Sequence, residues 1–180
     1  MAVCSTVMPV LSAADLCAQG THFGEISAIR FTRWGDDLTD WTDDTEWNTR
    51  LSNSTALATP PTLAAIRTLY CIGSVAAPER TEIRLPRRTK QYTAPKYSVQ
   101  LRVYDTSDAN MDAFRALPVG GQPFAVWLET EERMFGGNTG VFATLIGDPI
   151  IPESIDELMY LQLTVTFEGT FPEVQDNILA

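Results

Sequence analysis

The chain has 180 residues, a formal net charge of -10 and a sequence pI near 4.4. Its hydrophobic content of 44% excludes a disordered chain and is sufficient for one domain with a buried core. No apolar run approaches the ~20 residues of a membrane-spanning helix, and an acidic protein has little general affinity for the nucleic-acid backbone. We therefore expect a single domain over residues 1–180 that does not enter a membrane and does not bind DNA specifically.

The beginning of the chain and its cysteines indicate where it folds. Met1 to Val10 lack the basic flank and apolar stretch of a secretory signal, which predicts folding in a cytoplasm. The three cysteines, Cys4, Cys17 and Cys71, are odd in number and too far apart for a disulfide framework or for paired metal ligands. We expect them to be buried free thiols.

The N-terminal half has an irregular hydropathy pattern. It predicts a short helix over Ser12 to Gln19 and strands over Ile26 to Trp34 and Ile66 to Ile72. The residues before the first strand are expected to form an N-terminal extension of the domain.

Charge is concentrated in two segments of opposite sign. The first is an expected acidic loop at 35–50, which follows Trp34 and carries Trp41 and Trp47, and the second is an expected basic arm at 79–97. Neither segment has the apolar period of a core element, so both are predicted to protrude and to make contacts. The charged residues are Asp36, Asp37, Asp40, Asp43, Asp44 and Glu46 in the first segment and Arg80, Arg84, Arg87, Arg88, Lys90 and Lys96 in the second.

The clearest strands lie in the C-terminal half. Tyr97 to Val103 and Leu161 to Phe167 each alternate apolar with polar residues, as a half-buried strand requires. Between Asp105 and Pro118 the apolar residues instead recur at three-residue spacing after several N-cap residues, which predicts one short amphipathic helix.

A second pair of strands and a connection complete the expected fold. Phe124 to Leu128 and Val141 to Leu145 alternate on either side of a glycine-rich turn at 136–140, which predicts a hairpin. The prolines in Asp148 to Pro152 predict a connection rather than a strand, followed by a single turn at Ser154 to Glu157. Together these elements predict a mainly β fold: an antiparallel β-sandwich or partial barrel with one short flanking helix and long protruding loops.

Residues that could carry out catalysis or hold a metal are few. The one histidine, His22, lies near Cys4 and Cys17 in the sequence, but no third group that would orient such a pair can be named. The acidic loop does not follow the calcium-binding EF-hand pattern, and the glycines at 136–140 lack the Lys-Ser/Thr of a phosphate loop. We expect no catalytic residue, no cofactor and no metal site, and therefore no enzyme.

Four segments of the C-terminal half carry a resemblance to a known family. They are Gly120 to Thr130 (GGQPFAVWLET), Gly136-Gly137 before a strand, Ile151 to Glu157 (IPESIDE) and Leu163 to Gly169 (LTVTFEG). In the order of their strands and connections and in the type of their turns, these segments resemble the tail tube proteins of long-tailed bacteriophages. The resemblance implies a virion protein of the tail, assembled in the host cytoplasm into stacked hexameric rings. It also implies contacts with other tail proteins and a channel through which DNA passes without specific binding.

The opposite charges of the two segments predict the contact between neighbouring subunits. Aromatic anchors within the acidic loop would add apolar contacts to the same interface. The expected interface residues are Asp36, Asp37, Trp41, Asp43, Asp44, Trp47, Arg84, Arg87 and Arg88.

Two alternatives from other functional classes fit the same residues. A capsid decoration or head-tail joining protein would share the composition and the lack of catalytic residues. A carbohydrate-binding β-sandwich could use Trp34, Trp41 and Trp47 as stacking platforms.

Overall fold

The computed structural model describes residues 24–52, 65–84, 90–116, 123–153 and 157–179. The predicted helix at Ser12 to Gln19, His22, the first two cysteines and residues 154–156 of the predicted turn lie outside these ranges. The described residues are mainly in strands that pair antiparallel, which confirms the predicted mainly β class. The elements are β1 (Ile26–Arg33), α1 (Asp44–Ser52), β2 (Arg67–Val75), β3 (Glu82–Arg84), β4 (Lys90–Tyr92), β5 (Lys96–Val103), α2 (Asp108–Ala116), β6 (Phe124–Thr130), β7 (Arg133–Phe135), β8 (Val141–Ile150), β9 (Tyr160–Glu168) and β10 (Val174–Asp176).

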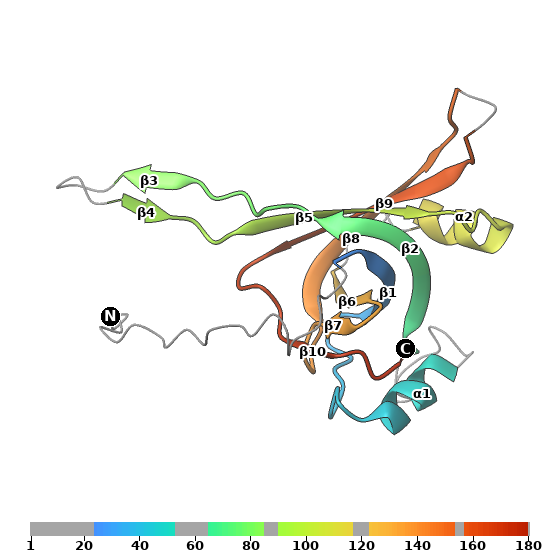
Figure 1. Ribbon diagram of the computed structural model, residues 1–180, viewed down its shortest axis with the longest axis horizontal. Helices are drawn as coiled ribbons and strands as arrows, with labels where there is room; N and C mark the ends of the chain where they lie inside the picture. The colour runs from blue at the N-terminus through green and yellow to red at the C-terminus, as the bar shows by residue number, and fades with distance from the viewer. Residues whose placement is uncertain (1–23, 53–64, 85–89, 117–122, 154–156, 180) are drawn as a thin grey trace, which may run out of the picture.

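Six of the strands close into a barrel (Figure 1). Neighbouring strands follow the order β1-β2-β5-β9-β8-β6, and β6 pairs again with β1. The closing pair runs along the whole of β1, from Ile26 opposite Thr130 to Arg33 opposite Phe124. The barrel is therefore closed, whereas the sequence predicted a sandwich or a partial barrel. Strands β7 and β10 extend the sheet beyond β6, and they are too short to give a sequence signal.

The barrel interior is filled by side chains from alternate strand positions. On β5 and β9 every second residue is buried, which confirms the predicted strands and their inward faces. Val99 lies opposite Val165 and Leu101 opposite Leu163, so apolar side chains of neighbouring strands meet in the interior. The buried residues of this cluster are Ile26, Ile29, Cys71, Tyr97, Val99, Leu101, Val103, Val126, Leu128, Ala143, Leu145, Leu161, Leu163, Val165 and Phe167.

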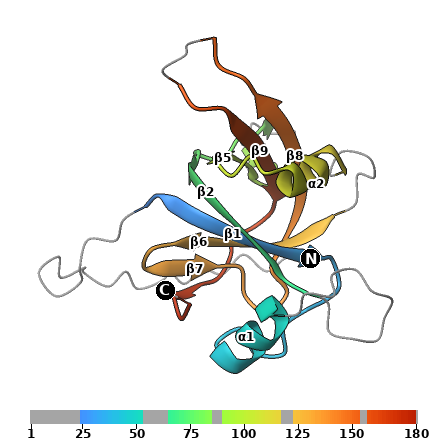
Figure 2. The same cartoon turned by 90° about the vertical axis from the view of Figure 1, so that its right-hand side faces the viewer.

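Strand β8 extends further than the prolines in its sequence predict. It continues through Pro149, which pairs with Leu161, so the prediction of a connection at 148–150 is wrong. Among the described residues β6 pairs only with Val141 to Ala143, so the rest of β8 has a strand neighbour on one side. A proline is tolerated there because its missing N–H group is not needed for a second ladder. The β8–β9 hairpin consequently reaches beyond the barrel (Figures 1 and 2).

The glycine-rich turn is shaped around one tryptophan. Trp127 of β6 is fully buried, and its indole N–H donates to the carbonyl of Gly137 at 2.7 Å. A Cβ atom at Gly136 would lie 2.3 Å from the Trp127 ring, and Gly137 and Gly140 have positive φ angles of +75° and +66°. The glycines therefore let the turn pass close over the ring. The predicted pairing of β6 with β8 is confirmed, with β7 inserted between them in the chain.

The predicted amphipathic helix is confirmed as α2. It begins at Asp108, and the backbone N–H of Met111 donates to the carbonyl of Ser107. The half-buried Met111 side chain packs against the barrel cluster. None of the helices within the described ranges has the length and apolar character needed to cross a membrane.

Replacing Phe167 by alanine should lower the free energy of unfolding by about 3–5 kcal/mol, the usual range for a truncated core aromatic. The side chain is 4% exposed and stacks on Tyr97 with ring centroids 4.8 Å apart. Thr166 lies on the opposite face of β9, so Thr166→Ala should have a much smaller effect. Urea denaturation followed by circular dichroism measures both variants, and equal losses would mean that this register is wrong.

Candidate functional site

The acidic segment packs against the barrel instead of forming an exposed loop. Residues 44–52 form helix α1, and Trp41 and Trp47 are 8% and 0% exposed. The Trp47 ring meets the Trp127 ring edge-on at 5.3 Å, and its N–H donates to the carbonyl of Trp41 at 2.7 Å. Both are core residues of this chain, so the prediction that they are exposed interface or stacking residues is wrong. The cluster comprises Leu38, Trp41, Trp47, Ile66, Ala125, Trp127 and Met134.

Several carboxylates of this segment are engaged by its own backbone. Glu46 accepts a hydrogen bond from the N–H of Thr39 at 3.0 Å. Asp43 accepts one from an N–H in the first turn of α1 at 2.9 Å, and it thereby caps the helix. Hydrogen bonds from Thr42 lower the pKa of Asp40. Part of the acidic character of this segment therefore serves the local fold.

A buried arginine fastens the start of the segment to α1. Arg50 is 1% exposed and donates to the carbonyl groups of Asp37 at 2.9 Å and Asp36 at 2.7 Å. Burial lowers the pKa of its guanidinium. The residues Asp37, Asp43 and Asp44 are exposed and Asp36 is half-buried, so a role of these four in a subunit interface stays a prediction.

The basic segment forms a hairpin that stands away from the barrel (Figure 1). Antiparallel pairing links the hairpin to the barrel. From the barrel outward, β2 pairs with β5, Glu79 forms a bridge with Lys96, and β3 pairs with β4. In the described part of the chain, β3 and β4 have no further strand beside them. Arg84 lies on β3, whereas Arg87 and Arg88 lie outside the described ranges. We refer to this element as the β3–β4 hairpin.

A buried ion pair lies at the seam between β1 and β6. Arg30 Nε is 2.7 Å from Glu129 Oε2, and the two side chains are 7% and 9% exposed. Arg30 also donates to the Thr68 hydroxyl at 3.0 Å, and Asn177 donates to the second Glu129 oxygen at 3.0 Å. The guanidinium lies 6.0 Å from the centre of the Trp47 ring. Both charges are thus matched within the chain, and no sequence pattern indicates the pair.

Cys71 is buried in the barrel cluster as a free thiol, which confirms the prediction for this cysteine. Burial raises the pKa of the Cys71 thiol to about 12, and the nearby charge of Glu129 acts in the same direction. A thiol that stays protonated is a poor nucleophile. Cys71 is therefore a packing residue rather than a reactive one.

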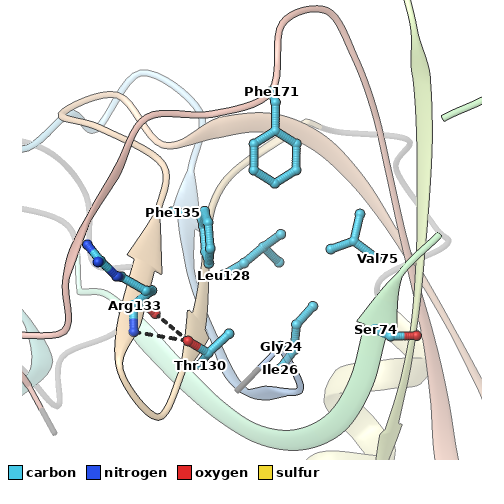
Figure 3. A pocket seen from close by; sticks show the side chains of 9 residues that line it. All are labelled: Gly24, Ile26, Ser74, Val75, Leu128, Thr130, Arg133, Phe135 and Phe171. Atoms are coloured by element: carbon cyan, nitrogen blue, oxygen red, sulfur yellow. Dashed lines mark hydrogen bonds between the residues drawn. The ribbon is translucent and has the colours of Figure 1, made fainter. Parts of the chain in front are cut away.

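A cavity of about 270 Å³ opens at one end of the barrel (Figure 3). Its lining is mostly apolar, and Leu128, Phe135 and Phe171 point into it. The Arg133 side chain points away, and the Thr130 hydroxyl accepts a hydrogen bond from the Arg133 N–H at 3.0 Å. The residues that line the cavity therefore provide no converging polar groups for acid–base chemistry.

The outward face of β5, β9 and β8 is polar and balanced in charge. Lys96 and Glu168 form an ion pair across it at 2.8 Å. Arg102 and Asp148 are the other charged residues on this face. The outward residues are Lys96, Ser98, Gln100, Arg102, Phe142, Thr144, Ile146, Asp148, Gln162, Thr164, Thr166 and Glu168, and the two apolar ones, Phe142 and Ile146, both lie on β8.

The described part of the chain contains no group of three metal-ligating side chains. Comparisons of the chain with models of protein families, with curated proteins and with solved structures found no match. The function is therefore inferred from the geometry of the molecule itself.

Glu129→Gln should lower the free energy of unfolding by about 3–5 kcal/mol, because it leaves the Arg30 charge buried without a counter-ion. The matched control is Glu131→Gln, since Glu131 is exposed, and it should change stability by less than about 0.5 kcal/mol. Urea denaturation compares the two variants. A loss no larger than that of the control would contradict a structural role for the ion pair.

Cys71 should react with iodoacetamide much more slowly in the folded than in the urea-unfolded protein at about pH 9. The measurement uses Cys4→Ser with Cys17→Ser, so that Cys71 is the sole cysteine. The raised pKa keeps the folded thiol protonated where an unfolded thiol of pKa 9.0 is half ionised. Equal rates of alkylation would contradict the burial of this thiol.

The free energy of unfolding should fall as the pH rises from 9.0 toward about 12, because the Cys71 thiol loses its proton at lower pH in the unfolded state than in the folded state.

Proposed function

We propose that this chain is a structural subunit that assembles with copies of itself into stacked rings, as in the tail tube of a long-tailed bacteriophage. The observation that carries the proposal is the β3–β4 hairpin, which stands outside the barrel and has no other described strand beside it. An isolated two-stranded hairpin is at best marginally stable in water. We therefore expect this hairpin to gain stability from a partner.

The closed barrel supports the proposal because it separates folding from assembly. The core cluster and the Arg30–Glu129 pair are complete within one subunit, so the subunit can fold before it meets another copy. The β3–β4 and β8–β9 hairpins lie outside the barrel, where they can make contacts (Figures 1 and 2). Contact between two different surfaces of identical subunits closes into a ring or continues as a stack.

The outward face of β5, β9 and β8 is the surface that we assign to the channel wall. Its side chains are mostly hydroxyls and amides, and its charges are balanced, with Lys96 paired to Glu168. A wall without excess positive charge would not retain DNA, because no counterions would be released on binding. The net charge of -10 on the whole chain acts in the same direction.

A capsid decoration or head-tail joining role would use the same extensions, but such a protein would not polymerise alone into tubes. The carbohydrate-binding alternative has lost support, because Trp41 and Trp47 are buried. Trp34 is 42% exposed, and its ring packs edge-on against Phe142 at 4.8 Å. One aromatic side chain is a small platform for a sugar.

Size-exclusion chromatography and negative-stain electron microscopy of the purified full chain test the proposed function. Rings that stack into tubes are the expected result. A single ring that does not stack would favour the head-tail joining role, and a monomer at every concentration would contradict self-assembly.

Arg87→Glu with Arg88→Glu should block polymerisation and leave a folded monomer, because it reverses much of the positive charge of the basic segment. Wild-type assembly should also weaken as ionic strength rises, since exposed charges are screened beyond ~8 Å at physiological salt. Sedimentation at matched protein concentration measures polymerisation, and circular dichroism verifies folding. Unchanged polymerisation of the double variant would exclude the basic segment from the interface.

A further inference from the structure

The β8–β9 hairpin is a second extension, and it projects to the upper right of Figure 1, away from the β3–β4 hairpin at the left. The ladder between β8 and β9 continues in register as far as Ile150 opposite Tyr160. Beyond this pair, Ile151 and Leu158 are 77% and 74% exposed. Large apolar side chains gathered at an exposed end commonly mark a surface that a partner covers.

The same end of the β8–β9 hairpin is acidic. Glu153 and Glu157 are exposed, and neither has a hydrogen-bond or ion-pair partner among the described residues. No lysine or arginine occurs between Gly147 and Leu161. The acidic tip, as we call it, consists of Ile151, Glu153, Glu157 and Leu158.

The β3–β4 hairpin has the complementary character. From Arg80 to Tyr92 the sequence has five basic residues and one acidic residue, Glu82. On the strands, Ile83 and Tyr92 are 45% and 57% exposed. The hairpin thus offers apolar side chains within positive charge, and the acidic tip offers apolar side chains within negative charge.

We propose that the β3–β4 hairpin of one copy docks on the acidic tip of the next copy. This inference rests on the proposed self-assembly and specifies the contact that produces it. Because the two extensions project away from each other, every copy supplies both a hairpin and a tip. Such a head-to-tail contact propagates from copy to copy.

The acidic tip suits this hairpin better than the acidic segment at 35–50 does. In that segment Glu46 and Asp43 already accept backbone hydrogen bonds, and the tryptophans are buried. Among the described residues, the carboxylates of the tip have no such partners to give up. Exposed Ile151 and Leu158 also add an apolar contribution, which salt does not screen.

Three charge-reversed variants of the full chain test this contact. A tip variant carries Glu153→Lys and Glu157→Lys, and a hairpin variant carries Arg84→Glu and Lys90→Glu. The matched control carries Glu25→Lys and Glu131→Lys, two exposed acidic residues outside both extensions. Circular dichroism first verifies that each variant is folded, and sedimentation then measures the protein concentration at which half of the chains are polymerised.

The tip variant and the hairpin variant should each raise that concentration by about tenfold or more, because like charges then meet. The control should stay within about twofold of wild type. An equal mixture of the tip and hairpin variants should polymerise again. In that mixture a positive hairpin meets an unaltered tip, and a negative hairpin meets a positive tip.

Polymerisation of the folded tip variant at the wild-type concentration would overturn this contact, as would a mixture of folded variants that fails to polymerise. In either case a polymerising wild-type chain would leave the proposed function standing. Loss of polymerisation in the folded control would also overturn this contact, because the effect would then follow the net charge of the chain and not the tip. A wild-type chain that remains monomeric would overturn both proposals.

Discussion

Closure of the barrel depends on the seam between β1 and β6, and water must be excluded from both the inner and the outer face of this strand pair. On the inside, Ile29 and Leu128 belong to the main cluster of the barrel. On the outside, the Arg30–Glu129 pair and Trp127 would face water if the segment before and within α1 did not cover them. If the Arg30–Glu129 pair lost one partner or became exposed to water, the β1–β6 pairing that closes the six-stranded barrel would be less stable. The segment at 35–50 therefore serves the barrel first, whatever its exposed carboxylates contact.

How far the sequence predicts this fold depends on the number of faces that each strand buries. Strands β5 and β9 each have one face toward solvent, so the alternation of apolar and polar residues predicts both the strands and which side faces the core. Strand β6 is buried on both faces, and the alternation that reveals it does not show that Trp127 and Glu129 are covered as well. Closure joins Arg30 to Glu129 across 99 positions, and no local pattern carries information about such a pairing.

The candidate surfaces were predictable to a similar, partial degree. The run of basic residues predicts that 79–97 protrudes, since no core strand could bury it. The same reasoning fails for the acidic segment. Its buried apolar residues are distributed over a loop and the helix α1, so they follow no fixed period: Leu38, Trp41 and Trp47. Pro149 predicted a connection, but it lies in a part of β8 that has a strand neighbour on only one side among the described residues, where a proline is tolerated. Tertiary context, rather than propensity, decides each of these cases.

The separation of β1 from β6 in the chain also sets the order in which the molecule can form. The β8–β9 hairpin and the β2–β5 ribbon pair residues that are much closer in sequence than the partners in β1 and β6, so their loops are less costly to close. Strand β1 must wait, unpaired on one edge, until β6 has been made and positioned. During that interval the chain carries finished hairpins beside two open strand edges, which another chain could occupy. Exchange of β1 or β6 between two chains is therefore the misfolding route that this topology leaves open.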